Sequence, residues 1–181
     1  TRLEDGGFVV GNPEAPITII EFADYACPHC QDYEPTMLRF INEHVKSGKA
    51  KFEFRIFPTA GGATTEFMGN MLVCMEEQKA GSFWKAHDRL FRDAASGNYD
   101  GETLRAIAAD IGVDYNTALE CSRDQKQVAT DTTLGQQLSV SGTPAVRVRY
   151  ADGEAAIIPG QERGGPTFDM LTALVVAANQ Q

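Results

Sequence analysis

The sequence has little positive charge and no long hydrophobic run. Its 181 residues contain 16 Lys and Arg against 25 Asp and Glu, a formal net charge of −9 at pH 7. An acidic surface of this kind disfavours binding to nucleic acid or to an anionic membrane as the main role. No apolar stretch approaches the roughly 18 residues that a transmembrane helix requires, so we expect a soluble chain. With 43% hydrophobic residues, the chain can still bury one sizeable core.

Cysteine is also scarce, and two of the four cysteines form the motif Cys27-Pro28-His29-Cys30. The apolar run 17–22, in which Glu21 is the one charge, predicts a buried strand directly before the motif. Helix-compatible residues follow it. The motif therefore lies at a strand-to-helix junction, with Pro28 at the first helical position, where the missing N–H of proline has no partner to lose.

This placement favours redox chemistry at the two sulfurs. Free backbone N–H groups and the positive end of the helix dipole stabilise an anion, so we expect Cys27 to be a thiolate at neutral pH. His29 adds a second donor or cation within reach of the same sulfur. A stabilised thiolate favours the reduced protein, which makes the disulfide form a strong oxidant. Cys30, one helical turn further on, is expected to face inward and to act as the resolving thiol.

Other uses of the motif fit less well. A c-type haem site requires His directly after the second cysteine, but Gln31 stands there. A structural zinc site needs two further ligands, and Cys74 and Cys121 do not form a second closely spaced pair. A non-enzymatic module that binds zinc or copper remains the alternative, and a purely structural disulfide within the motif would be strained. We expect neither a metal nor a cofactor.

The CPHC motif, the Glu-Phe strand end before it and a distant Gly-Thr-Pro together resemble the DsbA family of thioredoxin-fold disulfide oxidoreductases. The resemblance covers almost the whole chain. It implies an α/β thioredoxin fold, in which a central mixed sheet is flanked by helices and an all-helical domain is inserted. It also implies that Pro144 is a cis-proline facing the cysteine pair, and that Glu21 is the buried acid beneath that pair.

Two of these residues have a simpler interpretation as well. Pro144 could be a trans turn proline, since only about 5–6% of bonds before proline are cis in folded proteins. Its role by resemblance is to prevent strand pairing with Cys27 and to present the backbone of Thr143 to a substrate peptide by strand addition. Glu21 could be a charge at a strand edge. In so apolar a run we expect it to be buried, with a raised pKa, and to exchange a proton with Cys30.

Cys74 and Cys121 allow three interpretations. They could be buried free thiols, which behave as small hydrophobic side chains. They could form a structural disulfide between two helices, as in some DsbA relatives, and the even cysteine count favours this hypothesis. A second redox pair is less favoured, because neither cysteine belongs to a closely spaced pair or a helix start.

The hydrophobic pattern predicts two discontinuous parts. Residues 1–61 and 139–181 form the thioredoxin-like domain, and residues 62–138 form the inserted helical domain, because so long a segment is too long for a loop. We expect strands at 8–10, 17–22, 51–57, 145–150 and 155–158, and helices at 28–48, 65–78, 83–92, 101–111, 115–121, 124–138 and 166–178.

Local signals add detail to this pattern. Ser82, Asp100 and Asp114 are expected to cap the N-termini of the three helices that follow them. Pro35 is expected to kink the first helix. In the strand at 145–150, alternation predicts that Val146, Val148 and Tyr150 point inward and that Arg147 and Arg149 point outward.

The expected activity is that of an oxidase that donates the Cys27–Cys30 disulfide to unfolded or partly folded polypeptides. Resemblance implies re-oxidation by a membrane quinone-linked partner, similar to DsbB or VKOR, in the periplasm or another extracytoplasmic compartment. Because the chain begins at Thr1, we expect that an initiator Met or a secretory signal has been removed. A disulfide isomerase or reductase of the same fold is the alternative. The short segment before the first strand favours a monomer over the dimers of the isomerase branch.

Overall fold

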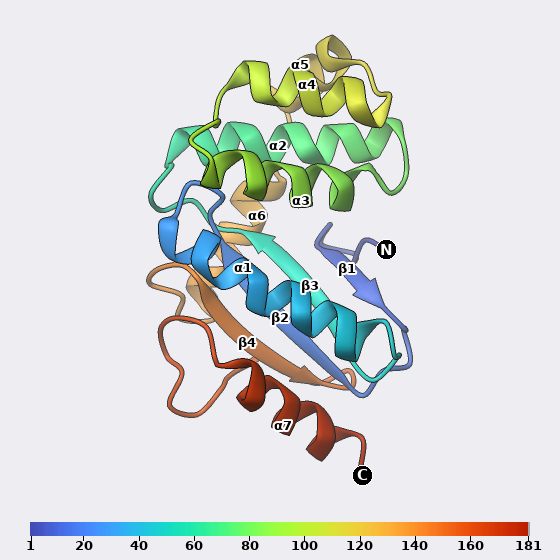
Figure 1. Ribbon diagram of the computed structural model, residues 1–181, viewed down its shortest axis with the longest axis vertical. Helices are drawn as coiled ribbons and strands as arrows, with labels where there is room; N and C mark the ends of the chain where they lie inside the picture. Colours follow the sequence, from blue (N-terminus) through green and yellow to red (C-terminus); the bar gives the residue numbers. More distant parts are fainter. Residues whose placement is uncertain (181) are drawn as a thin grey trace.

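The structure, a computed structural model, describes residues 1–180, and within them a five-stranded mixed sheet forms the centre (Figure 1). The strands lie in the order β1-β3-β2-β4-β5. Only β2 and β3 are parallel, and the remaining neighbours are antiparallel. The strand bounds are β1 (Phe8–Gly11), β2 (Ile17–Ala23), β3 (Lys51–Ile56), β4 (Ala145–Tyr150) and β5 (Ala156–Ile157).

The middle strand, β2, is buried along its whole length because helices cover both faces of the sheet. On one face, Ile19 belongs to a core shared with Met37 of α1 (Pro28–Phe40) and Leu171 of α7 (Phe168–Ala178). On the other face, Ile20 packs in a smaller cluster with Leu134 of α6 (Gln127–Gln137). A strand covered on both faces is expected to be a continuous apolar run, as β2 is.

Helices fill the chain between β3 and β4. They are α2 (Ala63–Gln78), α3 (Ser82–Ala95), α4 (Gly101–Ile111) and α5 (Tyr115–Ser122), followed by α6. Figure 1 shows α2 to α5 stacked beyond one end of the sheet, whereas α6 lies behind β3. The thioredoxin fold with inserted helices is therefore confirmed. The division at residues 62 and 138 stays a prediction.

Pro35 lies within the first helix, and the kink expected there stays a prediction. This helix continues as an α-helix to Phe40 and then as the π-helical segment η1 (Ile41–Val45). No helix of residues 1–180 combines the length and the apolar character needed to cross a membrane.

Two helix caps were predicted correctly, and one prediction is wrong. The carboxylates of Asp100 and Asp114 accept hydrogen bonds from backbone N–H groups three residues on, at 2.9 and 2.7 Å. Ser82, by contrast, is the first residue of α3, and its hydroxyl has no hydrogen-bond partner within residues 1–180. The free N–H groups of Gly81 and Phe83 are bound instead by the carboxylate of Glu76.

The orientation predicted for β4 is also wrong at two positions. Arg147 is fully buried, and its guanidinium donates to the carbonyl oxygens of Leu138, Val146 and Ser139. Tyr150, at the end of the strand, is 46% exposed. Alternation separates inward from outward residues only where one face of a sheet meets solvent, and here helices cover both faces.

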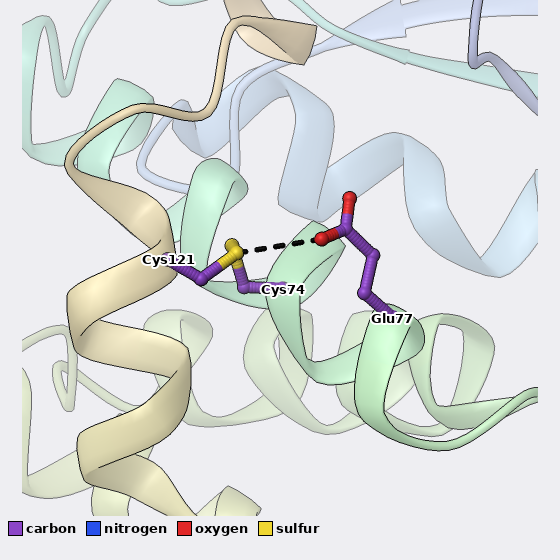
Figure 2. A group of neighbouring side chains, drawn as sticks. All are labelled: Cys74, Glu77 and Cys121. Carbon is purple, nitrogen blue, oxygen red and sulfur yellow. Dashed lines mark hydrogen bonds between the residues drawn. A yellow bond between two sulfur atoms is a disulfide. The ribbon is translucent and has the colours of Figure 1, made fainter.

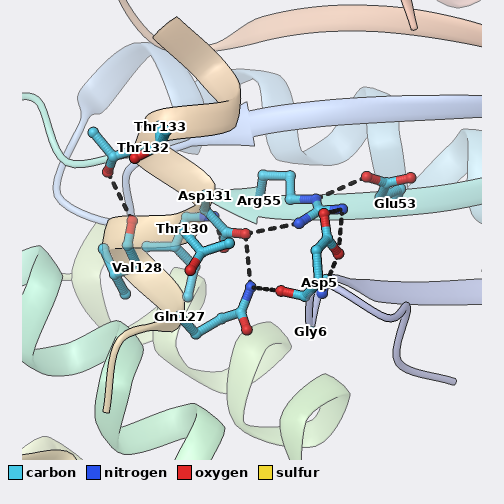
Figure 3. A network of polar contacts seen from close by, with 12 residues as sticks. Asp5, Gly6, Glu53, Arg55, Gln127, Val128, Thr130, Asp131, Thr132 and Thr133 are labelled. Atoms are coloured by element: carbon cyan, nitrogen blue, oxygen red, sulfur yellow. Dashed lines mark hydrogen bonds and ion pairs between the residues drawn. The ribbon is translucent and has the colours of Figure 1, made fainter. Parts of the chain in front are cut away.

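A buried polar network joins the N-terminal segment to β3 and α6 (Figure 3). The guanidinium of Arg55 is fully buried and donates to Glu53 at 2.7 Å, to Asp131 at 3.0 Å and to Asp5 at 3.0 Å. Arg149 reaches the second oxygen of Glu53 at 2.7 Å. The network thus balances buried charges of both signs on the α6 face of the sheet.

Candidate redox active site

The CPHC motif begins α1, as its sequence context predicts. Cys27 is the N-cap residue, with an extended backbone, and its carbonyl oxygen accepts the first helical hydrogen bonds from Cys30 and Gln31. Pro28 and His29 are exposed, whereas Cys27 is 6% exposed and Cys30 is fully buried. Both thiols are free in the structure. The outer sulfur can thus be attacked from solvent, while the inner one lies behind it.

A cis peptide bond joins Thr143 to Pro144 next to this pair. The carbonyl oxygen of Thr143 accepts a hydrogen bond from the Cys27 sulfur at 3.4 Å, although 116 residues separate the two in sequence. The loop before β4 thus brings a backbone carbonyl into contact with the Cys27 sulfur.

Glu21 lies in the interior of β2, on the same face as α1. Its side chain is fully buried, and neither carboxylate oxygen has a hydrogen-bond partner within residues 1–180. Burial raises the pKa of Glu21 well above its usual value, and the nearby charge of Glu34 raises it further. Both causes disfavour the charged form of this carboxyl group.

Cys30 shares this environment. Burial is the main cause that raises the pKa of its thiol far above the usual value, and the Glu21 carboxylate contributes in the same direction. A hydrogen bond from the backbone of Asp24 acts against this rise. The raised pKa favours the thiol form of Cys30 in the reduced protein.

Comparison with known proteins identifies the family. A sequence profile of the family described as thioredoxin matches residues 4–156. The chain belongs to this family. A probable disulfide bond formation protein D of Bacillus anthracis is 26% identical over 171 residues, which cover 90% of this chain and 73% of that relative.

Solved structures of DsbA-type proteins superpose well on this thioredoxin-family chain. Wolbachia pipientis alpha-DsbA1 superposes with a TM-score of 0.78 and 22% identity, over 96% of this chain and 91% of that one. Oxidised BdbD from Bacillus subtilis gives a TM-score of 0.77 with 20% identity, over 96% of this chain and 92% of that one. The fold is therefore the helix-inserted thioredoxin fold of DsbA proteins.

Sequence reasoning missed Glu34, one turn beyond Cys30 on the buried side of α1. Burial raises the pKa of Glu34 to about 7, and the charge of Asp88 adds to the effect. Its Oε1 lies 4.0 Å from Nε2 of His87. Burial lowers the pKa of His87 to about 3, so its imidazole is neutral and does not neutralise Glu34. The four-residue spacing from Cys30 was the signal that could have indicated a second acid near the pair.

An open groove lies beside the cysteine pair. One wall comes from α1, where the Tyr33 hydroxyl donates to the carbonyl oxygen of Pro166 at 2.8 Å. The other comes from the loops before β4 and α7. A Cβ at Gly165 would lie 2.2 Å from the Tyr33 ring, so a larger residue there would displace this ring. The groove is lined by His29, Asp32, Tyr33, Thr143, Pro144, Arg163, Gly164 and Gly165.

Cys74 and Cys121 form a disulfide between α2 and α5 (Figure 2). Their Cα atoms lie 5.9 Å apart, and Cys74 is almost completely buried. Glu77 lies 3.5 Å from the Cys121 sulfur, which as part of a disulfide has no proton to donate. The structure therefore assigns the four cysteines to one free pair at the start of a helix and one bonded pair between helices.

Proposed function

We propose that this protein is a thiol:disulfide oxidase that donates the Cys27–Cys30 disulfide to cysteine-containing polypeptides. One observation carries the proposal. The Cys27 sulfur at the start of α1 meets the carbonyl of Thr143 in the cis-proline loop, and Cys30 lies fully buried behind it. This arrangement supplies an accessible sulfur, a shielded partner and a backbone group for a substrate.

In the first step, a substrate thiolate attacks the Cys27 sulfur of the oxidised protein. A substrate–Cys27 disulfide forms, the Cys27–Cys30 bond breaks, and Cys30 leaves with the electron pair. In the second step, another substrate thiolate attacks the substrate sulfur and releases Cys27 as a thiolate. The substrate loses two electrons in total, and the cysteine pair gains them.

The surroundings of the two sulfurs favour these steps. The free N–H groups and the dipole at the start of α1 stabilise Cys27 as the leaving thiolate. Cys30, buried and next to Glu21, is a poor place for a negative charge. Glu21 gives its proton to Cys30 as the first step proceeds and recovers a proton when the disulfide is formed again.

The substrates are unfolded or partly folded polypeptides that lie extended in the groove beside Pro144. Their backbone pairs with that of Thr143 by strand addition, a mode that reads main chain rather than sequence. Thr143 and Pro144 both line the groove, which supports this role.

The same proposal covers the partners and the compartment. An oxidase must be re-oxidised, and a membrane quinone-linked protein similar to DsbB or VKOR would remove the two electrons. The Cys74–Cys121 disulfide supports an oxidising, extracytoplasmic compartment, such as the periplasm, because cytosolic thiols are kept reduced. We infer that the protein acts as a monomer.

Trapping of the substrate intermediate tests the proposal. In a Cys30→Ser variant the mixed disulfide through Cys27 cannot be resolved by Cys30, so it should accumulate with a reduced, unfolded two-cysteine substrate. Non-reducing gels followed by mass spectrometry detect it, and Cys27→Ser is the matched control. The absence of a Cys27-linked species would overturn the proposal. A tightly held equivalent of zinc or copper at the free pair would instead favour the metal-binding alternative.

A further inference from the structure

Two helices that pack together, α1 and α3, bring three possible metal ligands to one point. These are Glu34 of α1 and His87 and Asp88 of α3. Their ligand atoms, one oxygen from each carboxylate and one imidazole nitrogen, all lie within 4.8 Å of one another. Around a tetrahedral zinc ion with bonds of about 2.0–2.1 Å, neighbouring ligand atoms are separated by roughly 3.3 Å. Small side-chain rotations would therefore place the three groups around one ion.

The imidazole of His87 already has the orientation that a metal ligand needs. Its Nδ1 lies 3.2 Å from the Tyr25 hydroxyl, and its Nε2 faces the Glu34 carboxylate at 4.0 Å. Edge-on contacts with the rings of Phe54 and Phe91 hold the imidazole in place. The tautomer with its proton on Nδ1 donates to the Tyr25 oxygen and leaves a lone pair on Nε2. A hydrogen bond from the second ring nitrogen is the usual support of a histidine ligand.

The carboxylate of Glu34 and Nε2 of His87 have no hydrogen-bond partner within residues 1–180, although Glu34 is only 9% exposed and His87 only 2%. Burial raises the pKa of Glu34 to about 7, and the charge of Asp88 adds to the rise. Burial also raises the pKa of Asp88, and Arg92 acts against that rise. Buried polar groups normally have partners, so this group of ligands lacks one. A divalent ion would supply the positive charge that the two acids lack.

The three groups can be reached from solvent. A cavity of about 240 Å³ is lined by Gln31, Glu34 and Asp88, among other residues of α1 and α3. Asp88 is exposed, so its side chain can turn toward an ion that enters from the surface. A water molecule takes up roughly 30 Å³ in the liquid, so the cavity also has room for water as a fourth ligand.

The chemistry of the ligands favours zinc. One imidazole nitrogen, two carboxylate oxygens and a water form a set that zinc accepts, whereas calcium takes oxygen ligands alone. A second group of three potential ligands within residues 1–180 consists of Cys74, Glu77 and Cys121 (Figure 2). It does not qualify, because its two sulfurs are bonded to each other and neither is a thiolate.

We propose that Glu34, His87 and Asp88 form a zinc site between α1 and α3, separate from the cysteine pair. The proposal departs from the sequence-based expectation of no metal, because the two helices bring the three residues together only in the folded chain. Bound zinc would join α1, which covers the sheet, to α3 of the inserted helices. It would stabilise the protein, since an ion that binds only the folded state shifts the equilibrium toward that state.

Zinc titration of the oxidised protein tests this site. With Cys27 and Cys30 joined in a disulfide, neither sulfur is a thiolate that could bind the ion. Calorimetric titration should give one equivalent of zinc, and zinc should raise the unfolding temperature. Glu34→Gln and Asp88→Asn should each weaken binding at least about tenfold, the smallest loss typical even of residues that only support a ligand. Because Asp88 is exposed, Asp88→Asn leaves the core intact.

Further variants separate this site from loose binding at the surface. His87→Phe keeps the aromatic packing and removes the nitrogen ligand, so it should also lose the ion. His29→Ala removes an exposed imidazole of the same helix as Glu34, and Asp152→Asn removes an exposed carboxylate from the turn after β4. Both controls should bind zinc as the wild type does.

The absence of a saturable zinc site in the oxidised wild-type protein would overturn this inference. A site that keeps its affinity in Glu34→Gln and Asp88→Asn, or that is lost in His29→Ala, would overturn it as well, because the ion would then lie elsewhere. Disulfide donation by the cysteine pair is measured without zinc, so failure of the zinc site leaves the proposed function standing.

Discussion

Two buried acids on neighbouring strands point to opposite faces of the sheet and differ in their hydrogen-bond partners. Glu21 and Glu53 are both fully inaccessible to solvent, in β2 and β3. Glu53 points to the α6 face and is bound by two guanidinium groups at 2.7 Å. Glu21 points to the α1 face and has no hydrogen-bond partner within residues 1–180. A paired buried charge holds elements together, whereas an unpaired buried acid tends to hold a proton and can pass it on.

The polar network should give the largest effect. Arg55→Leu leaves Glu53 and Asp131 buried without their common cation, and loss of one partner of such a group costs about 3–5 kcal/mol. We expect this loss in the free energy of unfolding measured by urea denaturation. The oxidase activity per folded molecule should remain that of the wild type. A loss below about 1 kcal/mol would show that the network does not stabilise the fold in this way.

Loss of the Cys74–Cys121 disulfide should give the next largest loss of stability. Replacement of both Cys74 and Cys121 by Ala removes a constraint on the unfolded chain and should cost about 2–4 kcal/mol. Because these residues lie between α2 and α5, away from the start of α1, the Cys27–Cys30 redox equilibrium should not move. Urea denaturation and glutathione titration of the same variant check both parts, and a changed redox equilibrium would contradict the division into structural and reactive pairs.

Replacement of Glu21 should raise the free energy of unfolding, whereas the two preceding replacements lower it. Its folded-state pKa is raised, so the folded protein keeps a proton that the unfolded chain releases above pH about 4.5. The stability contributed by the protonated form is therefore lost progressively as pH rises above that value. Glu21→Gln should abolish this part of the pH dependence, so the variant gains on the wild type by roughly 1–3 kcal/mol between pH 5 and 8.

The same Glu21→Gln variant should be slower as an oxidase, because it has no proton to give to Cys30. Denaturation curves and single-turnover rates over this pH range provide the two measurements. Equal pH dependence of unfolding in both proteins would show that Glu21 is ionised when folded.

The smallest effect is expected at His29. This exposed side chain lies in the first turn of α1, where a donor or cation favours an anionic Cys27. His29→Ala should make the disulfide a weaker oxidant by up to about tenfold in the glutathione equilibrium, or roughly 30 mV. Asp32→Ala, at another exposed lining position of the groove, is the matched control. A wild-type equilibrium for His29→Ala would remove this residue from the mechanism.

The strand-to-helix position of the motif and the burial of Glu21 could be predicted from sequence, because both depend on a local apolar run. The caps at Asp100 and Asp114 are local too. The cis bond before Pro144 required resemblance to a family, since nothing in the local sequence distinguishes it from a trans bond.

Other features depend on contacts between distant segments. The sequence gives no signal for the buried carboxylate of Asp24, because the backbone N–H of Thr59 that binds it lies 35 positions away. The alternating pattern predicts an exposed Arg147, but its guanidinium donates to two carbonyl oxygens just after the end of α6. Ser82 was predicted to cap α3, but the carboxylate of Glu76 binds the free N–H of Phe83 instead. A local sequence pattern cannot show which side chain or backbone group from a distant segment binds a given residue in the folded protein.

The central claim is that the disulfide form of the Cys27–Cys30 pair is a strong oxidant and that the Cys74–Cys121 disulfide is structural. The most direct test is the reduction potential of Cys27–Cys30 in glutathione buffers, with alkylation and mass spectrometry to follow all four cysteines. The account predicts a value near the roughly −120 mV of strong oxidants, while Cys74 and Cys121 stay joined after the first pair is reduced. A value near about −270 mV, where thioredoxin lies, would indicate a reductase and contradict the account.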